Sequence, residues 1–163
     1  MDDALLCSIA RRYDIRNKKY ISTPFKCYFS DPGLRNACLD FRQISESRGM
    51  ENVIYNELLF RGFQVDTGVA SFSGKNERGQ VVRKQLDVNF MCSKNTRRYY
   101  IQSVFLLPDE IEMHQLQEPF RRIDDFFKRI IITKDCPAPY YTENGVLVMS
   151  IYDFLLNPDS LSF

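Results

Sequence analysis

A helix-forming stretch followed directly by strand-forming stretches constrains the fold of this chain more than any other feature. Apolar residues recur at helical spacing from Met50 to Leu59, and Gly62 stands where a helix needs a left-handed C-terminal cap. The spacing predicts a helix over residues 50–61. Gly49 is expected to break the chain just before it.

The segments after this helix predict a meander of strands and then a second helix. Alternating and β-branched residues predict the strands, and turn-forming residues separate them. The expected strands cover residues 64–68, 69–72, 81–91, 98–106, 130–133 and 146–149. The expected helices cover 109–120, restarting after Pro119 and continuing to near Phe127, and 151–156; Tyr140 and Tyr141 are expected in a loop. This order indicates an α/β fold with a mixed sheet.

The N-terminal part predicts a separate hairpin. Residues 4–13 pass from apolar to basic, residues 14–19 form a polar turn, and the chain returns from Tyr20, so the hairpin has a basic tip. A helix is expected over residues 33–40, capped near Asp31. Nothing earlier in the sequence can cover the apolar face of this hairpin, so we expect the chain to be the tail of a longer polypeptide.

Composition narrows the class of protein. With 163 residues and 44% hydrophobic content the chain can bury a substantial core in one domain, with at most a small appendage. The net charge of +1 creates no global field, so any binding of nucleic acid must come from a local patch. Five scattered cysteines and one histidine argue against a disulfide framework or a zinc site and fit a reducing cytoplasm. Leader-like and membrane-spanning apolar segments are absent from the sequence, so a membrane partner is not expected.

Three polar residues are candidates for a catalytic or metal-binding site. Glu51 opens the predicted helix, Asp87 interrupts an apolar strand where a charge is costly without a partner, and Gln102 lies on the next strand. In order and spacing they resemble the core of the PD-(D/E)XK, or restriction-endonuclease-like, superfamily. There, a helix acid, a strand Asp and a Glu-x-Lys pair converge on a divalent metal. The resemblance implies that Glu51 and Asp87 are the metal-ligating positions, with Gln102 replacing the second acid and Val104 the lysine.

These replacements predict a degenerate site. An amide at Gln102 keeps an oxygen but removes a charge that Mg²⁺ favours, and Val104 cannot orient or deprotonate water. No cofactor is therefore expected, and Mg²⁺ or Mn²⁺ would be held only if cleavage survives. An active nuclease with a migrated cation, from Arg98, Arg121 or Arg122, stays open as an alternative. So do two structural interpretations, in which Glu51 favours the helix dipole and Gln102 is a buried amide bonded to the neighbouring strand.

A longer resemblance covers nearly the whole chain and concerns the C-terminal domain of unknown function of prokaryotic AAA-type ATPases. It rests on collinear segments at residues 12–20, 28–36, 51–58, 99–103, 123–128 and 151–156. It implies a winged-helix-like wing and linking helix over residues 1–45, a nuclease-like domain over 46–163, and the ATPase domain of a parent chain as partner. The sequence has no Gly-x-x-x-x-Gly-Lys-Ser/Thr, so it contains no P-loop.

Basic residues near the hairpin tip are candidates for phosphate contacts. The candidates are Arg11, Arg12, Arg16, Lys18, Lys19 and, on a later strand, Arg98. Tyrosines are interleaved with them, as in wings that contact nucleic acid, although a solvated hairpin face explains the pattern equally well. The expected function is a non-catalytic, DNA-binding or interaction module of a cytoplasmic ATPase. A module that docks only onto protein is the other alternative.

Overall fold

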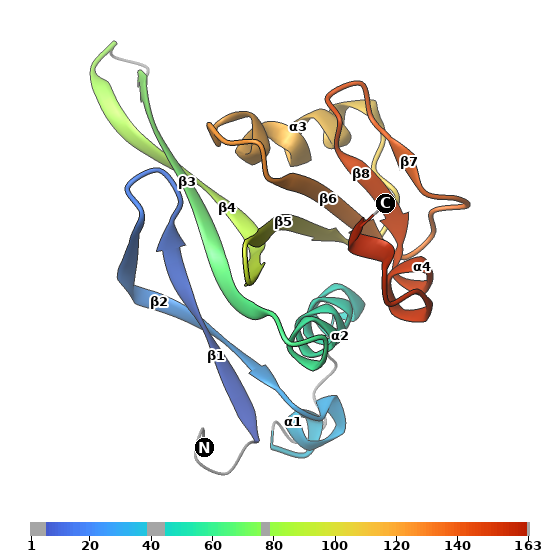
Figure 1. The fold of residues 1–163 in the computed structure, drawn as a ribbon. Coiled ribbons are helices and arrows are strands. Elements are labelled where there is room, and N and C mark those ends of the chain that lie inside the picture. Colours follow the sequence, from blue (N-terminus) through green and yellow to red (C-terminus); the bar gives the residue numbers. More distant parts are fainter. Residues whose placement is uncertain (1–5, 39–44, 76–78, 163) are drawn as a thin grey trace.

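A mixed eight-stranded sheet organises the described residues, which in this computed structural model are 6–38, 45–75 and 79–162 (Figure 1). The strand order is β2-β1-β3-β4-β5-β6-β8-β7. The strands are β1 (Cys7–Asp14), β2 (Lys19–Phe29), β3 (Gln64–Lys75), β4 (Val81–Lys94), β5 (Arg97–Val104), β6 (Lys128–Thr133), β7 (Tyr140–Tyr141) and β8 (Leu147–Ser150). The helices are α1 (Pro32–Cys38), α2 (Glu46–Phe60), α3 (Glu110–Arg121), α4 (Ile151–Leu156) and a short 3-10 turn, η1 (Ser160–Ser162).

Helices cover both faces of the sheet and explain its two apolar clusters. Helices α2 and α4 lie on one face and α3 on the other (Figure 1). Within β6, Ile130 and Ile132 join the cluster under α2 and α4, whereas Ile131 joins the cluster under α3; all three are fully buried. The prediction that this β-branched run forms a strand buried on both faces is confirmed. So is the order of helix, antiparallel meander, helix and parallel strand that indicated a mixed α/β fold.

Helix α2 is confirmed, but its start was misplaced. Ser45 caps the helix, and its side chain accepts from the backbone N–H of Arg48. The expectation that Gly49 breaks the chain is wrong, because a glycine in the first turn is tolerated when a good N-cap precedes it. At the other end Gly62 adopts φ +80°, and the N–H of Phe63 bonds to the carbonyl of Leu58, so the predicted glycine cap is present.

Residues 64–75 form one strand instead of the two that were expected. A bulge shifts the pairing of β3 and β4 between Asp66 and Gly68, and the strand continues through it. Gly68 is needed there because a Cβ would lie 3.0 Å from the Ile15 side chain and 3.1 Å from Val88. The glycine thus allows a close approach and does not end the strand.

Two further expectations are corrected in the C-terminal half, and one in the N-terminal half is confirmed. Helix α3 holds Pro119 within its last turn and ends at Arg121, so it neither restarts nor reaches Phe127. Tyr140 and Tyr141 form the edge strand β7, paired with β8, instead of a loop. The expected helix over 33–40 is present as α1; residues 39 and 40 lie outside the described part of the chain.

The N-terminal hairpin is present and joins the main sheet. Strand β1 pairs with β2 in antiparallel register and with β3 in parallel register, over Arg12 to Asp14 (Figure 1). Ala10 and Tyr28 of the hairpin belong to the apolar cluster beneath α2. The division at residue 45 and the comparison with a wing remain predictions. Among the described residues no helix is long and apolar enough to cross a membrane.

Candidate functional site

Glu51 lies on α2 with its carboxylate directed at the hairpin. One oxygen, Oε1, accepts from Lys26 Nζ at 2.7 Å and from the Tyr28 hydroxyl at 2.5 Å. Burial, together with the neighbouring carboxylate of Glu51, raises the pKa of Tyr28 far above its ordinary value, so the phenol stays a donor. The helix acid of the predicted metal site is therefore engaged by two side chains of β2.

Asp87 is on β4, opposite Val69 of β3, and it is exposed rather than enclosed. Arg12 on β1 donates to its Oδ1 at 2.6 Å, while 64% of the Asp87 side chain remains accessible. The cation beside this acid thus comes from the hairpin. Of the candidates for a migrated cation, Arg121 contacts His114 and Arg122 pairs with Glu118, whereas Arg98 lies over the ring of Phe127.

Gln102 is a buried amide that joins two strands where their backbone pairing stops. The β4–β5 pairing ends at Phe90 and Ile101. Beyond it, Gln102 Nε2 donates to the carbonyl of Asp87 at 3.0 Å, and its Oε1 accepts from the N–H of Asn89 at 3.1 Å. The Asn89 side chain in turn accepts from the N–H of Ser103 at 3.1 Å. Two side-chain amides therefore replace the missing backbone bonds, as the structural interpretation of Gln102 predicted.

The three positions lie on adjacent elements, yet their side chains have separate partners. Glu51 bonds to β2, the Asp87 carboxylate to β1, and Gln102 to the backbone of β4. Within the described ranges no group of three or more His, Cys, Asp or Glu residues is arranged to hold a metal. Their assignment as degenerate catalytic positions, and of Glu51 and Asp87 as metal ligands, stays a prediction.

Replacing Gln102 by Glu is expected to destabilise the protein, even though it introduces the acid that the resemblance drawn from the sequence expects at this position. The carboxylate loses the donor to the Asp87 carbonyl and leaves a buried oxygen facing it, at a cost of about 2 kcal/mol in the free energy of unfolding. Urea denaturation at neutral and at acid pH measures this, and the deficit should shrink when the carboxyl is protonated. Gln115→Glu, on an exposed position of α3, is the matched control. Equal stability of Gln102→Glu and the control would contradict this role.

The basic candidates separate into two groups in space. Arg16 and Lys18 at the hairpin tip meet Arg98 of β5 and Arg122 at the end of α3 around a pocket of about 430 Å³. Asp124 and Asp125 line the same pocket, so four cations face two carboxylates. We call this the tip pocket. The sequence indicated Arg16, Lys18 and Arg98 as phosphate contacts and Arg122 as a candidate cation, but no local pattern predicted that they lie together.

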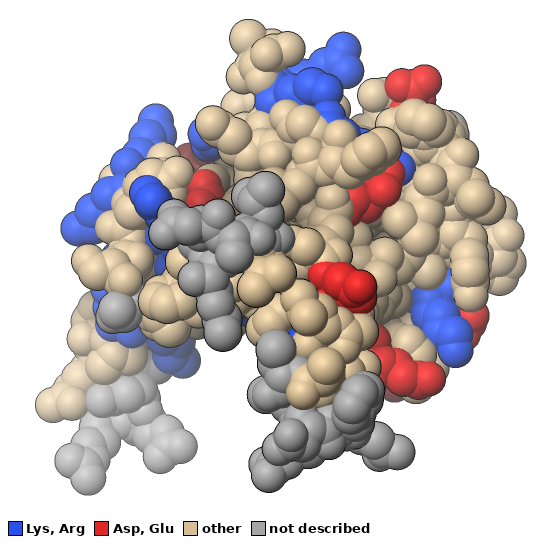
Figure 2. Space-filling model, turned by 90° about the horizontal axis from the view of Figure 1, so that it is seen from below, with Lys and Arg blue, Asp and Glu red and all other residues tan. Residues whose placement is uncertain are grey.

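The other basic candidates lie outside the tip pocket. Arg12 is held by Asp87, Lys19 is exposed on β2, and Arg11 is exposed near Asp66. Burial raises the pKa of Asp66, and the hydrogen bonds from Tyr20 and from Arg11, together with the charge of Arg11, only partly offset that effect. Seen from below, several Lys and Arg lie on the side of the molecule that carries the hairpin, others lie at the top and lower right of the view, and most visible acids lie towards the middle and the right (Figure 2).

Asp14 anchors the hairpin tip and was missed as a functional position. Its side chain is fully buried and accepts from the backbone N–H and side chain of Asn17, from Ser71 at 3.0 Å and from Arg83 at 2.6 Å. Burial alone would raise the pKa of Asp14, but these hydrogen bonds and the charge of Arg83 lower it below its ordinary value. In the sequence it looked like an ordinary turn residue because its partners on β3 and β4 are distant in the chain.

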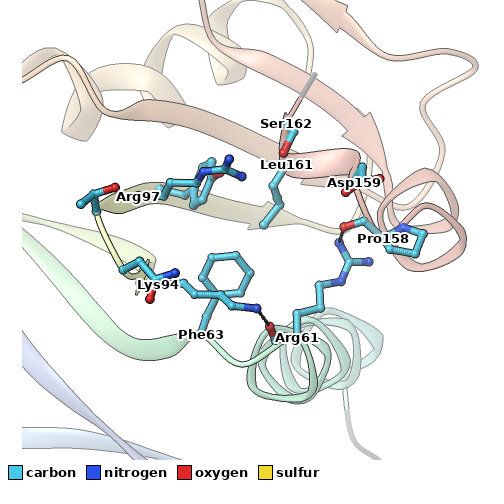
Figure 3. Close-up of a pocket in the computed structure, with 11 residues that line it drawn as sticks. Arg61, Phe63, Lys94, Arg97, Pro158, Asp159, Leu161 and Ser162 are labelled. Carbon is cyan, nitrogen blue, oxygen red and sulfur yellow. Dashed lines mark hydrogen bonds between the residues drawn. The ribbon is translucent and has the colours of Figure 1, made fainter.

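A second pocket, of about 660 Å³, lies between the end of α2 and the β4–β5 turn (Figure 3). Lys94 crosses it to donate to the Arg61 carbonyl at 2.6 Å. Arg61 also bonds to Glu57, one helical turn earlier, and to the carbonyls of Phe154 and Pro158. This arginine is fully engaged in fixing the C-terminal segment against α2, which leaves it little capacity for a ligand.

Comparison with known proteins gives distant homology only. The chain is 30% identical over 159 residues to an uncharacterized protein of Haemophilus influenzae (strain ATCC 51907 / DSM 11121 / KW20 / Rd). The similarity covers 96% of this chain and 35% of that protein, so the chain spans about a third of the relative's length. No protein-family model and no solved structure matches.

Proposed function

We propose that this chain is a nucleic-acid-binding module with a nuclease-like fold that does not cleave, working as the C-terminal part of an AAA-type ATPase. The observation that carries the proposal is the tip pocket, where four cations from three separate elements converge. Arginine and lysine side chains gathered from distant segments match the spaced negative charges of a phosphate backbone.

The charges of the tip pocket are only partly compensated within the protein. Arg122 pairs with Glu118 at 2.5 Å and lies over Phe72, and Asp125 accepts from the Tyr100 hydroxyl at 2.6 Å. Arg16 and Lys18 are exposed at the tip and have no ion-pair partner in the described part of the chain. These two cations are therefore available to an incoming phosphate.

The hydrogen-bond partners of Glu51, Asp87 and Gln102 support the proposed absence of cleavage. The Gln102 side-chain amide makes hydrogen bonds to β4 through both its oxygen and its nitrogen. The carboxylates of Asp87 and Glu51 are bonded to side chains of the hairpin. Val104 supplies no cation, and Arg12, which lies beside Asp87, is a poor base because a guanidinium stays protonated. The arrangement is suited to holding two strands together and lacks a group to activate water.

The link to an ATPase rests on the resemblance and is consistent with the length of the relative. That protein is nearly three times as long as the matched segment, which leaves room in it for a motor. The described fold offers no P-loop of its own, so any ATP-dependent step would come from another domain.

Fluorescence anisotropy with labelled duplex and single-stranded oligonucleotides tests the proposal. At low salt we expect saturable binding that weakens as salt is raised. Plasmid incubated with the protein and Mn²⁺ should show no cleavage above that of Asp87→Ala. No binding at high protein concentration would overturn the proposal in favour of a protein-docking module. Cleavage that Asp87→Ala abolishes would instead establish a nuclease.

A further inference from the structure

A cationic surface continues from the tip pocket around the β4–β5 turn. A shallow pocket of about 420 Å³ there shares Arg98 and Phe127 with the tip pocket. Its other lining residues include Arg97, Lys128 and Phe126. None of the described lining residues is acidic, so this surface is more uniformly positive than the tip pocket itself.

Phe126 stands out on this surface because its ring is entirely exposed. Its relative accessibility is 108%, whereas neighbouring Phe127 packs edge-on against Tyr100 and under the guanidinium of Arg98. In the described part of the chain Phe126 has no aromatic or cationic contact. Burial in the fold therefore does not account for the ring at this position.

The loop that presents Phe126 is held on both sides. The N–H of Phe127 donates to the Asp125 side chain at 3.1 Å, and Arg129 donates to the carbonyls of Ile123 and Asp125 at 3.0 and 2.8 Å. An exposed ring on a fixed loop, lining the same pocket as Arg97 and Lys128, is suited to stacking with a base while these cations contact the backbone.

We propose that this surface binds single-stranded nucleic acid, with one base stacked on Phe126 and the flanking phosphates on Arg97 and Lys128. The inference deepens the proposed function and rests on it. Charge complementarity selects an anionic polymer, and the free ring selects unpaired bases, since the faces of bases within a duplex are already stacked.

Phe126→Ala tests the role of the ring. We expect it to weaken binding of a short oligothymidine about fivefold or more, the loss of one stacked base, and to change duplex affinity little. Phe60→Ala is the matched control, because Phe60 is another exposed phenylalanine, 88% accessible, on α2. Unchanged single-strand affinity of Phe126→Ala, or equal losses for both nucleic acids, would overturn the inference.

A fluorescent reporter gives a second readout that does not depend on loss of function. The sequence contains no tryptophan, so Phe126→Trp introduces a single indole at the proposed stacking position. Its emission should be quenched on addition of oligothymidine and not of duplex. Wild-type binding without quenching in Phe126→Trp would overturn the stacking inference alone, whereas no binding of either oligonucleotide by wild type would overturn the proposed function.

Discussion

Asp14→Ala is expected to lower the free energy of unfolding by about 3 kcal/mol, the largest effect on stability that we predict outside the apolar core. The substitution removes a fully buried acceptor that ties the hairpin turn, through Asn17, to Ser71 of β3 and Arg83 of β4. The backbone N–H of Asn17 and the Ser71 hydroxyl lose their acceptor, and water cannot easily replace it at Ser71, which is buried. Urea denaturation followed by circular dichroism measures the change.

Glu143→Ala is the control for this experiment, because Glu143 is an exposed acid in the β7–β8 turn. We expect a change there within about 0.5 kcal/mol. A similar, small loss for Asp14→Ala would show that the hairpin tip is not held by this carboxylate.

The Asp14 carboxylate should also make the free energy of unfolding depend on pH in the acid range. Since hydrogen bonds and Arg83 lower the pKa of Asp14 in the folded protein, its stabilisation is fully present above the pKa of the unfolded chain, near 3.8. It is lost as the pH falls through the lower folded pKa. Asp14→Asn should therefore be less stable than wild type at neutral pH, and the difference should narrow in that acid range. A constant difference would contradict this account.

The variant Arg16→Gln with Lys18→Asn is expected to weaken duplex binding by roughly 30-fold or more at about 50 mM salt. Both residues line the tip pocket and are exposed at the hairpin tip, so two phosphate contacts are lost without disturbing an internal ion pair. Asparagine is chosen at position 18 because Lys18 has φ 51°, a left-handed conformation that asparagine tolerates.

A charge-matched variant controls for the loss of net charge. Arg48→Gln with Lys84→Gln removes two exposed cations on α2 and β4, neither of which lines the tip pocket. We expect its affinity to stay within about threefold of wild type, because only the general field changes. Equal weakening by both variants would show that binding follows net charge and not the tip pocket.

The sequence predicted the elements whose signals are local. The glycine cap at Gly62 and the β-branched run of β6 both depend on nearby residues, and both are confirmed. The break at Gly49 and the end of a strand at Gly68 were wrong because a cap and a neighbouring strand override glycine's intrinsic tendency. Tyr140 and Tyr141 pair with β8 through a contact that no local pattern encodes.

In the candidate site, too, contacts between distant segments could not be predicted from the sequence. Glu51, Asp87 and Gln102 could be selected by their order along the chain, but their partners could not. Lys26 and Arg12 reach the two carboxylates only because β1 and β2 join the sheet beside β3. The tip pocket and the role of Asp14 likewise depend on strand pairings far apart in the sequence.

The salt dependence of duplex binding tests the central claim most directly. The logarithm of the association constant, plotted against the logarithm of salt concentration, should fall linearly for wild type, and Arg16→Gln with Lys18→Asn should reduce the magnitude of the slope by roughly 2. Plasmid should stay intact with Mn²⁺ throughout. A slope unchanged in that variant would contradict phosphate contact at the tip pocket, and cleavage dependent on Asp87 would contradict a binding module without nuclease activity.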